Sequence, residues 1–116
     1  MKREDSLKRK KEFRYTYRTG KATQHKYFSC IVARRKAGPS RIGISVSKKQ
    51  GNSVTRNRIK RRLREAVTPF IPHIKEGYNI IFVARRGIPE AEFIKLTEMV
   101  RDALNQSKLL DQEEVV

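Results

Sequence analysis

The chain has 116 residues, a net charge of +16 and a sequence pI of about 10.6. This length allows one domain with a modest core and excludes two. The single cysteine, Cys30, excludes a disulfide framework and a cysteine-based zinc site. No apolar run reaches membrane-spanning length, and the N-terminus has charges where a signal peptide is apolar, so we expect a cytoplasmic protein. Such an excess of cations in a small domain predicts a nucleic-acid binder, and an anionic membrane surface is the lesser option.

A basic arm of about residues 1–7 leads into the first predicted helix. Phe13 and Tyr17 are spaced i, i+4, so they lie on one side of a short helix that ends at Gly20. This helix is too short and too basic to be stable alone, so it must dock on the rest of the chain. Residues 19–26 then read as a loop.

Two segments with alternating side chains predict strands, at residues 26–36 and 41–47. Because a short turn joins them, we expect the two strands to pair antiparallel. Gly43, Ser45 and Ser47 share one face of the second strand. Side chains this small leave room either for a ligand or for close packing of a helix, and the pattern does not choose between the two.

The most informative stretch is a basic helix that starts after Gly51, with Asn52 or Ser53 as its cap, and ends near Thr68. Its core-facing stripe has helical spacing and consists of Ile59, Leu63, Ala66, Val67 and Phe70. Its opposite side carries Asn57, Lys60, Arg61 and Arg64, flanked by Arg58 and Arg62. Arg56 falls near the edge of the apolar stripe, so we place it at the helix entrance.

The crowded cations of this helix indicate a polyanionic partner. Like charges at i, i+4 cost a few tenths of a kcal/mol per pair, and only Glu65 interrupts them. A merely solvated helix would mix signs. Nucleic acid offers regularly spaced phosphates, and counterion release drives such binding.

The last third of the chain predicts one strand and one helix. Residues 78–84 are almost wholly apolar and form a strand buried on both faces. Pro89 suits the first turn of the last helix, where Glu90 and Glu92 complement the helix dipole. We expect its packing side to consist of Ile94, Met99, Val100, Ala103 and Leu104. An acidic, frayed tail of about residues 108–116 follows.

This order of elements predicts a single α+β domain spanning residues 1–116, a small sandwich with one sheet covered by helices. The basic helix connects two strands, which makes it a candidate crossover between parallel neighbours. The general preference for such a crossover is right-handed.

Catalytic patterns are missing from the sequence. His25 and His73 have no acidic partner at metal or triad spacing, and no Gly-rich phosphate loop occurs. Cys30 lies on the apolar face of a strand, where it acts as a small hydrophobe. We therefore predict no catalytic and no metal-binding residue in this chain.

The segment GNSVTRNRIKRRLR, residues 51–64, resembles the protein subunit of bacterial ribonuclease P. That family has an Arg-Asn-Arg helix preceded by a Lys-Lys-x-Gly turn, here Lys48-Lys49-Gln50-Gly51. The similarity continues through residues 41–47 and through Phe13, Tyr17 and Gly20. It covers roughly residues 5–105 in the same order.

The resemblance implies a ribonucleoprotein endonuclease that removes the 5′ leader from precursor tRNA. Its catalytic subunit is an RNA that binds Mg²⁺, so the partners implied here are that catalytic RNA and precursor tRNA, with no membrane and no small-molecule substrate. The residues implied to bind the catalytic RNA are Arg56, Asn57, Arg58, Lys60, Arg61 and Arg64. Those implied to bind the single-stranded leader in a cleft are Phe13, Tyr17, Ser45 and Lys49.

The resemblance also implies a ribosomal protein S5 domain 2-like fold. This has a mostly antiparallel four-stranded sheet, about three helices and a left-handed β-α-β crossover through the basic helix, against the general preference. Two positions depart from the family pattern: Ser53 stands where Ala is usual, and Ile31 where some members have a cleft-facing aromatic. We do not count Ile31 as a stacking residue.

Two other functions compete with this one. A structural ribosomal-type RNA-binding protein would need the basic helix but not exposed aromatic rings at Phe13 and Tyr17. An RNA-independent nuclease would need a metal-binding carboxylate pair, which the sequence does not offer.

Overall fold

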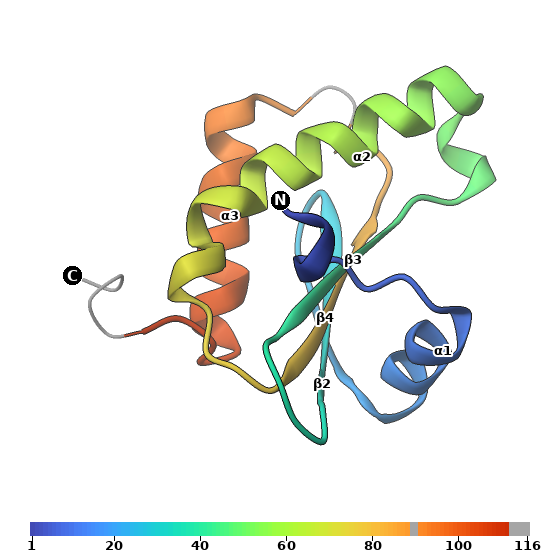
Figure 1. The fold of residues 1–116 in the computed structure, drawn as a ribbon. Coiled ribbons are helices and arrows are strands. Elements are labelled where there is room, and N and C mark those ends of the chain that lie inside the picture. Colours follow the sequence, from blue (N-terminus) through green and yellow to red (C-terminus); the bar gives the residue numbers. More distant parts are fainter. Residues whose placement is uncertain (89–90, 112–116) are drawn as a thin grey trace.

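The computed structural model describes residues 1–88 and 91–111 (Figure 1). Within these ranges the chain forms three α-helices, four strands and three short 3-10 segments. In chain order they are η1 Arg3–Asp5, α1 Lys10–Thr19, β1 Lys21–Gln24, β2 Phe28–Arg34, β3 Arg41–Ser45, η2 Lys48–Gln50, α2 Ser53–Val67, η3 Thr68–His73, β4 Tyr78–Ala84 and α3 Phe93–Gln106. None of the described helices is long and apolar enough to cross a membrane.

The four strands form one sheet in the order β1-β2-β4-β3. β2 pairs antiparallel with β1 and with β4, whereas β3 pairs parallel with β4. The predicted antiparallel pairing of β2 with β3 is therefore wrong. β4 lies between β2 and β3, and its residues 80–82 are fully buried, as expected for an interior strand covered on both faces.

The predicted loop at residues 19–26 is also wrong, because it contains β1. The strand has the sequence KATQ and is mostly exposed, so no apolar alternation marks it. Only its backbone pairing with β2, from Lys21–Val32 to Gln24–Ser29, makes it a strand.

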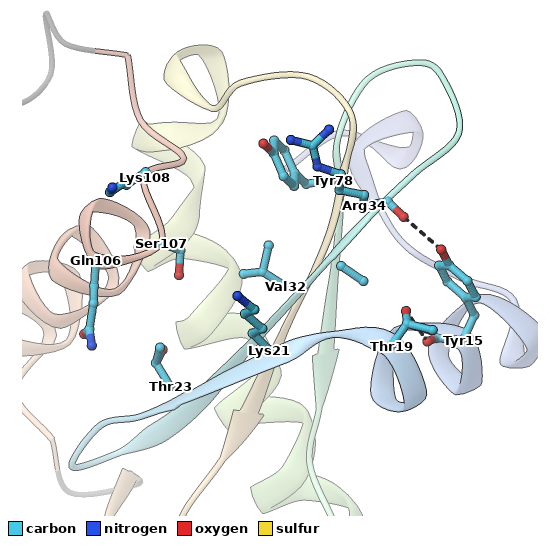
Figure 2. Close-up of a pocket in the computed structure, with 11 residues that line it drawn as sticks. Tyr15, Thr19, Lys21, Thr23, Val32, Arg34, Tyr78, Gln106, Ser107 and Lys108 are labelled. Carbon is cyan, nitrogen blue, oxygen red and sulfur yellow. Dashed lines mark hydrogen bonds between the residues drawn. The ribbon is translucent and has the colours of Figure 1, made fainter.

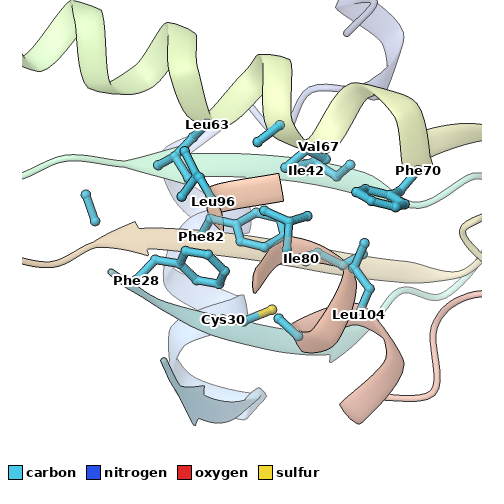
Figure 3. Close-up of a cluster of buried hydrophobic side chains, with 14 of the residues drawn as sticks. Phe28, Cys30, Ile42, Leu63, Val67, Phe70, Ile80, Phe82, Leu96 and Leu104 are labelled. Carbon is cyan, nitrogen blue, oxygen red and sulfur yellow. The ribbon is translucent and has the colours of Figure 1, made fainter. Parts of the chain in front are cut away.

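The crossover from β3 to β4 through α2 is left-handed. α2 and α3 cover one face of the sheet and α1 lies on the other (Figure 1). Figure 3 views the sheet from the side of α2 and α3. When that view is turned so that the parallel strands β3 and β4 point up, β4 lies to the left of β3. The fold is thus the α+β, mostly antiparallel arrangement that the resemblance implies, with the unusual hand.

The main core lies between the sheet and the α2–α3 layer (Figure 3). The stripe predicted for the basic helix is confirmed: Ile59, Leu63, Ala66 and Val67 are buried on α2, and Phe70 on η3. Its facing residues from the sheet and α3 include Phe28, Cys30, Ile42, Ile80, Phe82, Leu96 and Leu104.

The predicted packing side of α3 is partly wrong. Val100, Ala103 and Leu104 are buried, but Ile94 is 72% exposed. Leu96 is buried in its place because it lies four residues before Val100 on the same side of the helix. Glu92 directly precedes α3, and the predicted Pro89 and Glu90 lie outside the described residues.

Residues near both ends of the described chain dock on the domain. Leu7 is buried and its backbone amide donates to the Ile42 carbonyl at 2.8 Å, beside a bridge between Ser6 and Ile42 at the edge of β3. Leu110 is buried and bridges to Ile74. The acidic residues predicted at 113 and 114 lie outside the described residues.

Candidate nucleic-acid interface

Helix α2 begins at a side-chain cap. The Asn52 side chain accepts a hydrogen bond from the Thr55 amide at 3.0 Å, which confirms one of the two predicted caps. Gly51 has φ +139°, and a Cβ there would lie 3.0 Å from the Thr55 side chain. Glycine is therefore the residue that lets the chain turn from η2 into α2. The turn and the cap together set where α2 begins.

The outward residues of α2 are those that the helical spacing predicts. Asn57, Arg58, Arg61 and Arg64 are exposed and Lys60 is half-buried. We call these five residues the basic surface of α2. In the described part of the chain, its arginines form no ion pair with a carboxylate. Their charge is available to an external polyanion.

Two other arginines of α2 are used within the protein. Arg56 is half-buried at the helix entrance, where its Nη2 donates to Ser53 Oγ at 3.3 Å. Arg62 donates to the Ile88 carbonyl at 3.2 Å and also to the Ala91 carbonyl. Arg62 thereby ties the segment before α3 to α2. Arg56 therefore stabilises the start of α2, and Arg62 stabilises the contact between α2 and the segment before α3.

Phe13 and Tyr17 form an aromatic pair on α1, with ring centroids 6.5 Å apart. Phe13 is half-buried and lies over Gly43 of β3, where a Cβ would come within 2.6 Å of the ring. Tyr17 is 45% exposed. The small residue at Gly43 thus serves close packing of a helix, which decides one of the alternatives that the sequence left open.

The other two residues predicted to bind the leader, Ser45 and Lys49, lie on β3 and on the η2 segment that follows it. Ser45 is half-buried and shares the sheet face of Gly43, because alternate residues of a strand point the same way. Lys49 is exposed on η2, beyond the end of β3. Ile31 packs below the end of α1, where its Cγ2 would be 2.8 Å from a Cβ at Gly20.

A polar network that the sequence reading missed holds α1 on the sheet. Asn79 of β4 is buried; its Oδ1 accepts from Arg35 Nη1 at 2.8 Å and its Nδ2 donates to Thr16 Oγ1 at 3.1 Å. Arg35 also pairs with Glu12 at 3.3 Å, and Thr16 donates to the Glu12 carbonyl at 2.7 Å. The signal in the sequence is a lone Asn in an otherwise apolar strand, which needs buried partners.

The histidines and the cysteine have structural surroundings. His25 packs its ring 5.2 Å from the Phe28 ring, and its Nε2 lies 2.9 Å from Thr23 Oγ1. Burial lowers the pKa of His25, partly offset by Asp102. Burial raises the pKa of Cys30 to about 12, so the thiol stays protonated at neutral pH. Within the described ranges, no group of three or more His, Cys, Asp or Glu residues could hold a metal ion.

Comparison with known proteins gives one consistent result. The family model described as Ribonuclease P matches residues 1–108. The ribonuclease P protein component of Clostridioides difficile is 36% identical over 108 residues, which is 92% of this chain and 95% of that protein. The corresponding protein of Symbiobacterium thermophilum is 34% identical over 114 residues, 97% of this chain and 99% of its own.

Solved structures agree with the sequence matches. The ribonuclease P protein of Staphylococcus aureus has a TM-score of 0.82 and 30% identity, covering 92% of this chain and 98% of its own. That of Thermotoga maritima has a TM-score of 0.78 and 27% identity, covering 87% and 96%. A mutant of the S. aureus protein, described as defective in mRNA degradation activity, has a TM-score of 0.83 and 30% identity, covering 92% and 91%. This chain belongs to the ribonuclease P protein family.

Proposed function

We propose that this chain is the RNA-binding subunit of ribonuclease P, the endonuclease that removes the 5′ leader from precursor tRNA. The observation that carries the proposal is the basic surface of α2, whose exposed arginines have no carboxylate partner in the described structure. Such a surface gains free energy by releasing counterions from RNA phosphates. The relatives compared above are named ribonuclease P protein component, which supports the ribonuclease P RNA as the partner.

The proposed division of labour assigns the chemistry to the RNA subunit. The catalytic RNA binds the Mg²⁺ of the reaction and cleaves the phosphodiester, while the protein supplies positive charge and a surface for the substrate. No side chain of the protein is assigned a catalytic role. We propose that the assembly works in the cytoplasm, with the catalytic RNA and precursor tRNA as its partners.

Within this function, we assign the basic surface of α2, together with Arg56, to the catalytic RNA. Phe13, Tyr17, Ser45 and Lys49 are assigned to the single-stranded leader. Stacking of a base on an aromatic ring contributes about 1–3 kcal/mol and tolerates any base. This property suits a protein that must accept many different leaders. The exposed Tyr17 ring and the Phe13 ring beside it support the assignment.

The first experiment tests whether catalysis needs both components. Precursor tRNA is incubated at low Mg²⁺ with a bacterial ribonuclease P RNA, with and without this protein, and with the protein alone. We expect cleavage only where the RNA is present, and faster cleavage when the protein is added. Cleavage by the purified protein alone would contradict the division of labour.

The second experiment tests the leader assignment with Phe13→Ala. Losing one stacked base should weaken the affinity of the holoenzyme for leader-bearing precursor tRNA by about tenfold and leave mature tRNA binding unchanged. Phe93→Ala on α3 is a matched control, since Phe93 is 42% exposed and lies on the opposite layer. Equal losses for precursor and mature tRNA would favour a purely structural RNA-binding role.

A further inference from the structure

A pocket of about 520 Å³ lies at the β1 edge of the sheet, between β1, β2 and the end of α3 (Figure 2). We call it the edge pocket. It exists because β1 stops pairing with β2 at Lys21 and Val32, which leaves the rest of the β2 edge uncovered. Tyr15 reaches this edge from α1, where its hydroxyl donates to the Arg34 carbonyl at 3.3 Å.

The edge pocket is distinct from the residues assigned to the leader. Val32 pairs with Ile80 and so points to the α2–α3 side of the sheet, as does Arg34 two residues later. Phe13 packs over Gly43 on the opposite side. On α1, Tyr15 is two residues from Phe13, which turns it about 200° away from the aromatic pair.

The charged residues that line the edge pocket are all cations. These cations are exposed and come from three segments: Lys21 from β1, Arg34 from β2, and Lys108 from the second position after the end of α3. No carboxylate side chain lines the pocket, and none of these cations forms an ion pair within the described ranges. Cations gathered from three separate segments favour an anion in or above the pocket.

The pocket also offers aromatic and apolar surface. The Tyr78 ring is half-buried, with the Arg34 guanidinium 5.9 Å from its centroid, and Val32 is partly exposed beside it. A carboxylate or a free phosphate would use the cations alone. A nucleotide uses both parts, since its base stacks on a ring while its phosphate meets the cations. The volume lies within the usual range of small-ligand sites.

We propose that the edge pocket binds one unpaired nucleotide of single-stranded RNA, with its base against Tyr78 and its phosphates at Lys21 and Lys108. The proposal rests on the proposed RNA-binding function and adds a second RNA contact at the β1 edge of the sheet, apart from the residues assigned to the leader. It gives a role to the exposed Tyr15, which forms the wall of the pocket next to α1.

The experiment is an NMR titration of the ¹⁵N-labelled full chain with octauridylate, and with inorganic polyphosphate of matched charge. We expect octauridylate, but not polyphosphate, to shift the backbone amides of Ala33, Tyr78 and Ser107. Lys21→Glu combined with Lys108→Glu should weaken octauridylate binding about tenfold and lower its log-log salt slope by about 1.4, or 0.7 per lost contact. The control is Lys26→Glu combined with Lys95→Glu, which makes the same change in net charge at exposed residues outside the pocket.

The outcomes separate this proposal from the function on which it rests. Shifts confined to the Phe13 and Gly43 region, equal losses in the pocket and control variants, or equal shifts with polyphosphate would overturn the edge pocket alone. No binding of octauridylate anywhere, with no gain of holoenzyme cleavage, would overturn both.

The source of the nucleotide is then found with the holoenzyme components. The pocket variant is compared with its control for affinity to the catalytic RNA and, after assembly, to precursor tRNA. If the pocket variant alone loses affinity for the catalytic RNA, the nucleotide belongs to the catalytic RNA. If it alone loses affinity for precursor tRNA after assembly, the nucleotide belongs to the leader. A loss in neither assay overturns the proposal.

Discussion

The basic surface of α2 and the aromatic pair of α1 are positioned in different ways. Every residue of the first comes from one helical stretch, residues 57–64, and the helical repeat alone places them on one side. The second depends on distant partners: Phe13 packs over Gly43, and α1 is held through Asn79. Changes that harm the first should leave the fold intact, whereas changes that misplace the second should also destabilise it.

The largest expected effect on stability comes from Asn79→Ala. This change leaves Arg35 and Thr16 without their buried partner, and an unsatisfied buried group costs about 1–3 kcal/mol. We expect the free energy of unfolding, measured by urea titration, to fall by about 3 kcal/mol.

Asn57→Ala is the matched control for Asn79→Ala, since Asn57 is exposed on α2. It should change stability by less than about 0.5 kcal/mol. Similar losses for the two variants would remove the contrast between the surfaces.

A smaller loss is expected for Gly43→Ala. The new Cβ would lie 2.6 Å from Cζ of Phe13, so the ring must move away from the sheet. Overpacking of this kind costs about 1–3 kcal/mol, and we expect about 2 kcal/mol in urea unfolding together with weaker binding of leader-bearing precursor tRNA.

A double-mutant cycle checks the cause of this loss. Removing the ring with Phe13→Ala should relieve the clash, so Gly43→Ala should cost less in that background than in the unchanged chain. Strictly additive losses would show that Phe13 is not the neighbour that Gly43 accommodates.

The same contrast explains what the sequence could and could not predict. Local patterns sufficed for α2 with its cap and buried stripe, and for the buried strand β4, because the deciding contacts lie within a few residues of one another. β1 was not predicted because its short sequence, KATQ, shows no alternation of apolar and polar side chains. The pairing of β2 with β3 was mispredicted because a short turn usually joins neighbours, and nothing local shows that β4 inserts between them.

Long-range contacts account for the remaining gaps. The Asn79 network joins residues 44 and 63 positions apart, and no spacing rule reports such contacts. The hand of the crossover came from the family resemblance, since the general rule favours the other hand. The edge pocket arises because β1 pairs with β2 only as far as Val32, while β2 continues to Arg34. This difference depends on the register of the two strands, which no local pattern in the sequence shows.

A third prediction concerns the local support of the basic surface. Asn52→Ala removes the side-chain cap of α2 and should lower the free energy of unfolding by about 1 kcal/mol. Asn52→Gly should cost only a few tenths of a kcal/mol, because glycine is itself tolerated at this position. Equal losses for the two variants would mean that the hydrogen bond to Thr55 contributes nothing to helix stability.

The smallest effect on stability, and the clearest effect on binding, is expected for Arg61→Ala. Arg61 is exposed, so the free energy of unfolding should change by less than about 0.5 kcal/mol. If Arg61 meets a phosphate of the catalytic RNA, the log-log salt dependence of that affinity should lose about one unit of slope. Lys95→Ala on α3 removes the same charge from an exposed residue of another helix and should leave the slope unchanged. An unchanged slope for Arg61→Ala would mean that α2 faces solvent in the complex, while equal changes for both variants would mean that net charge alone drives the association.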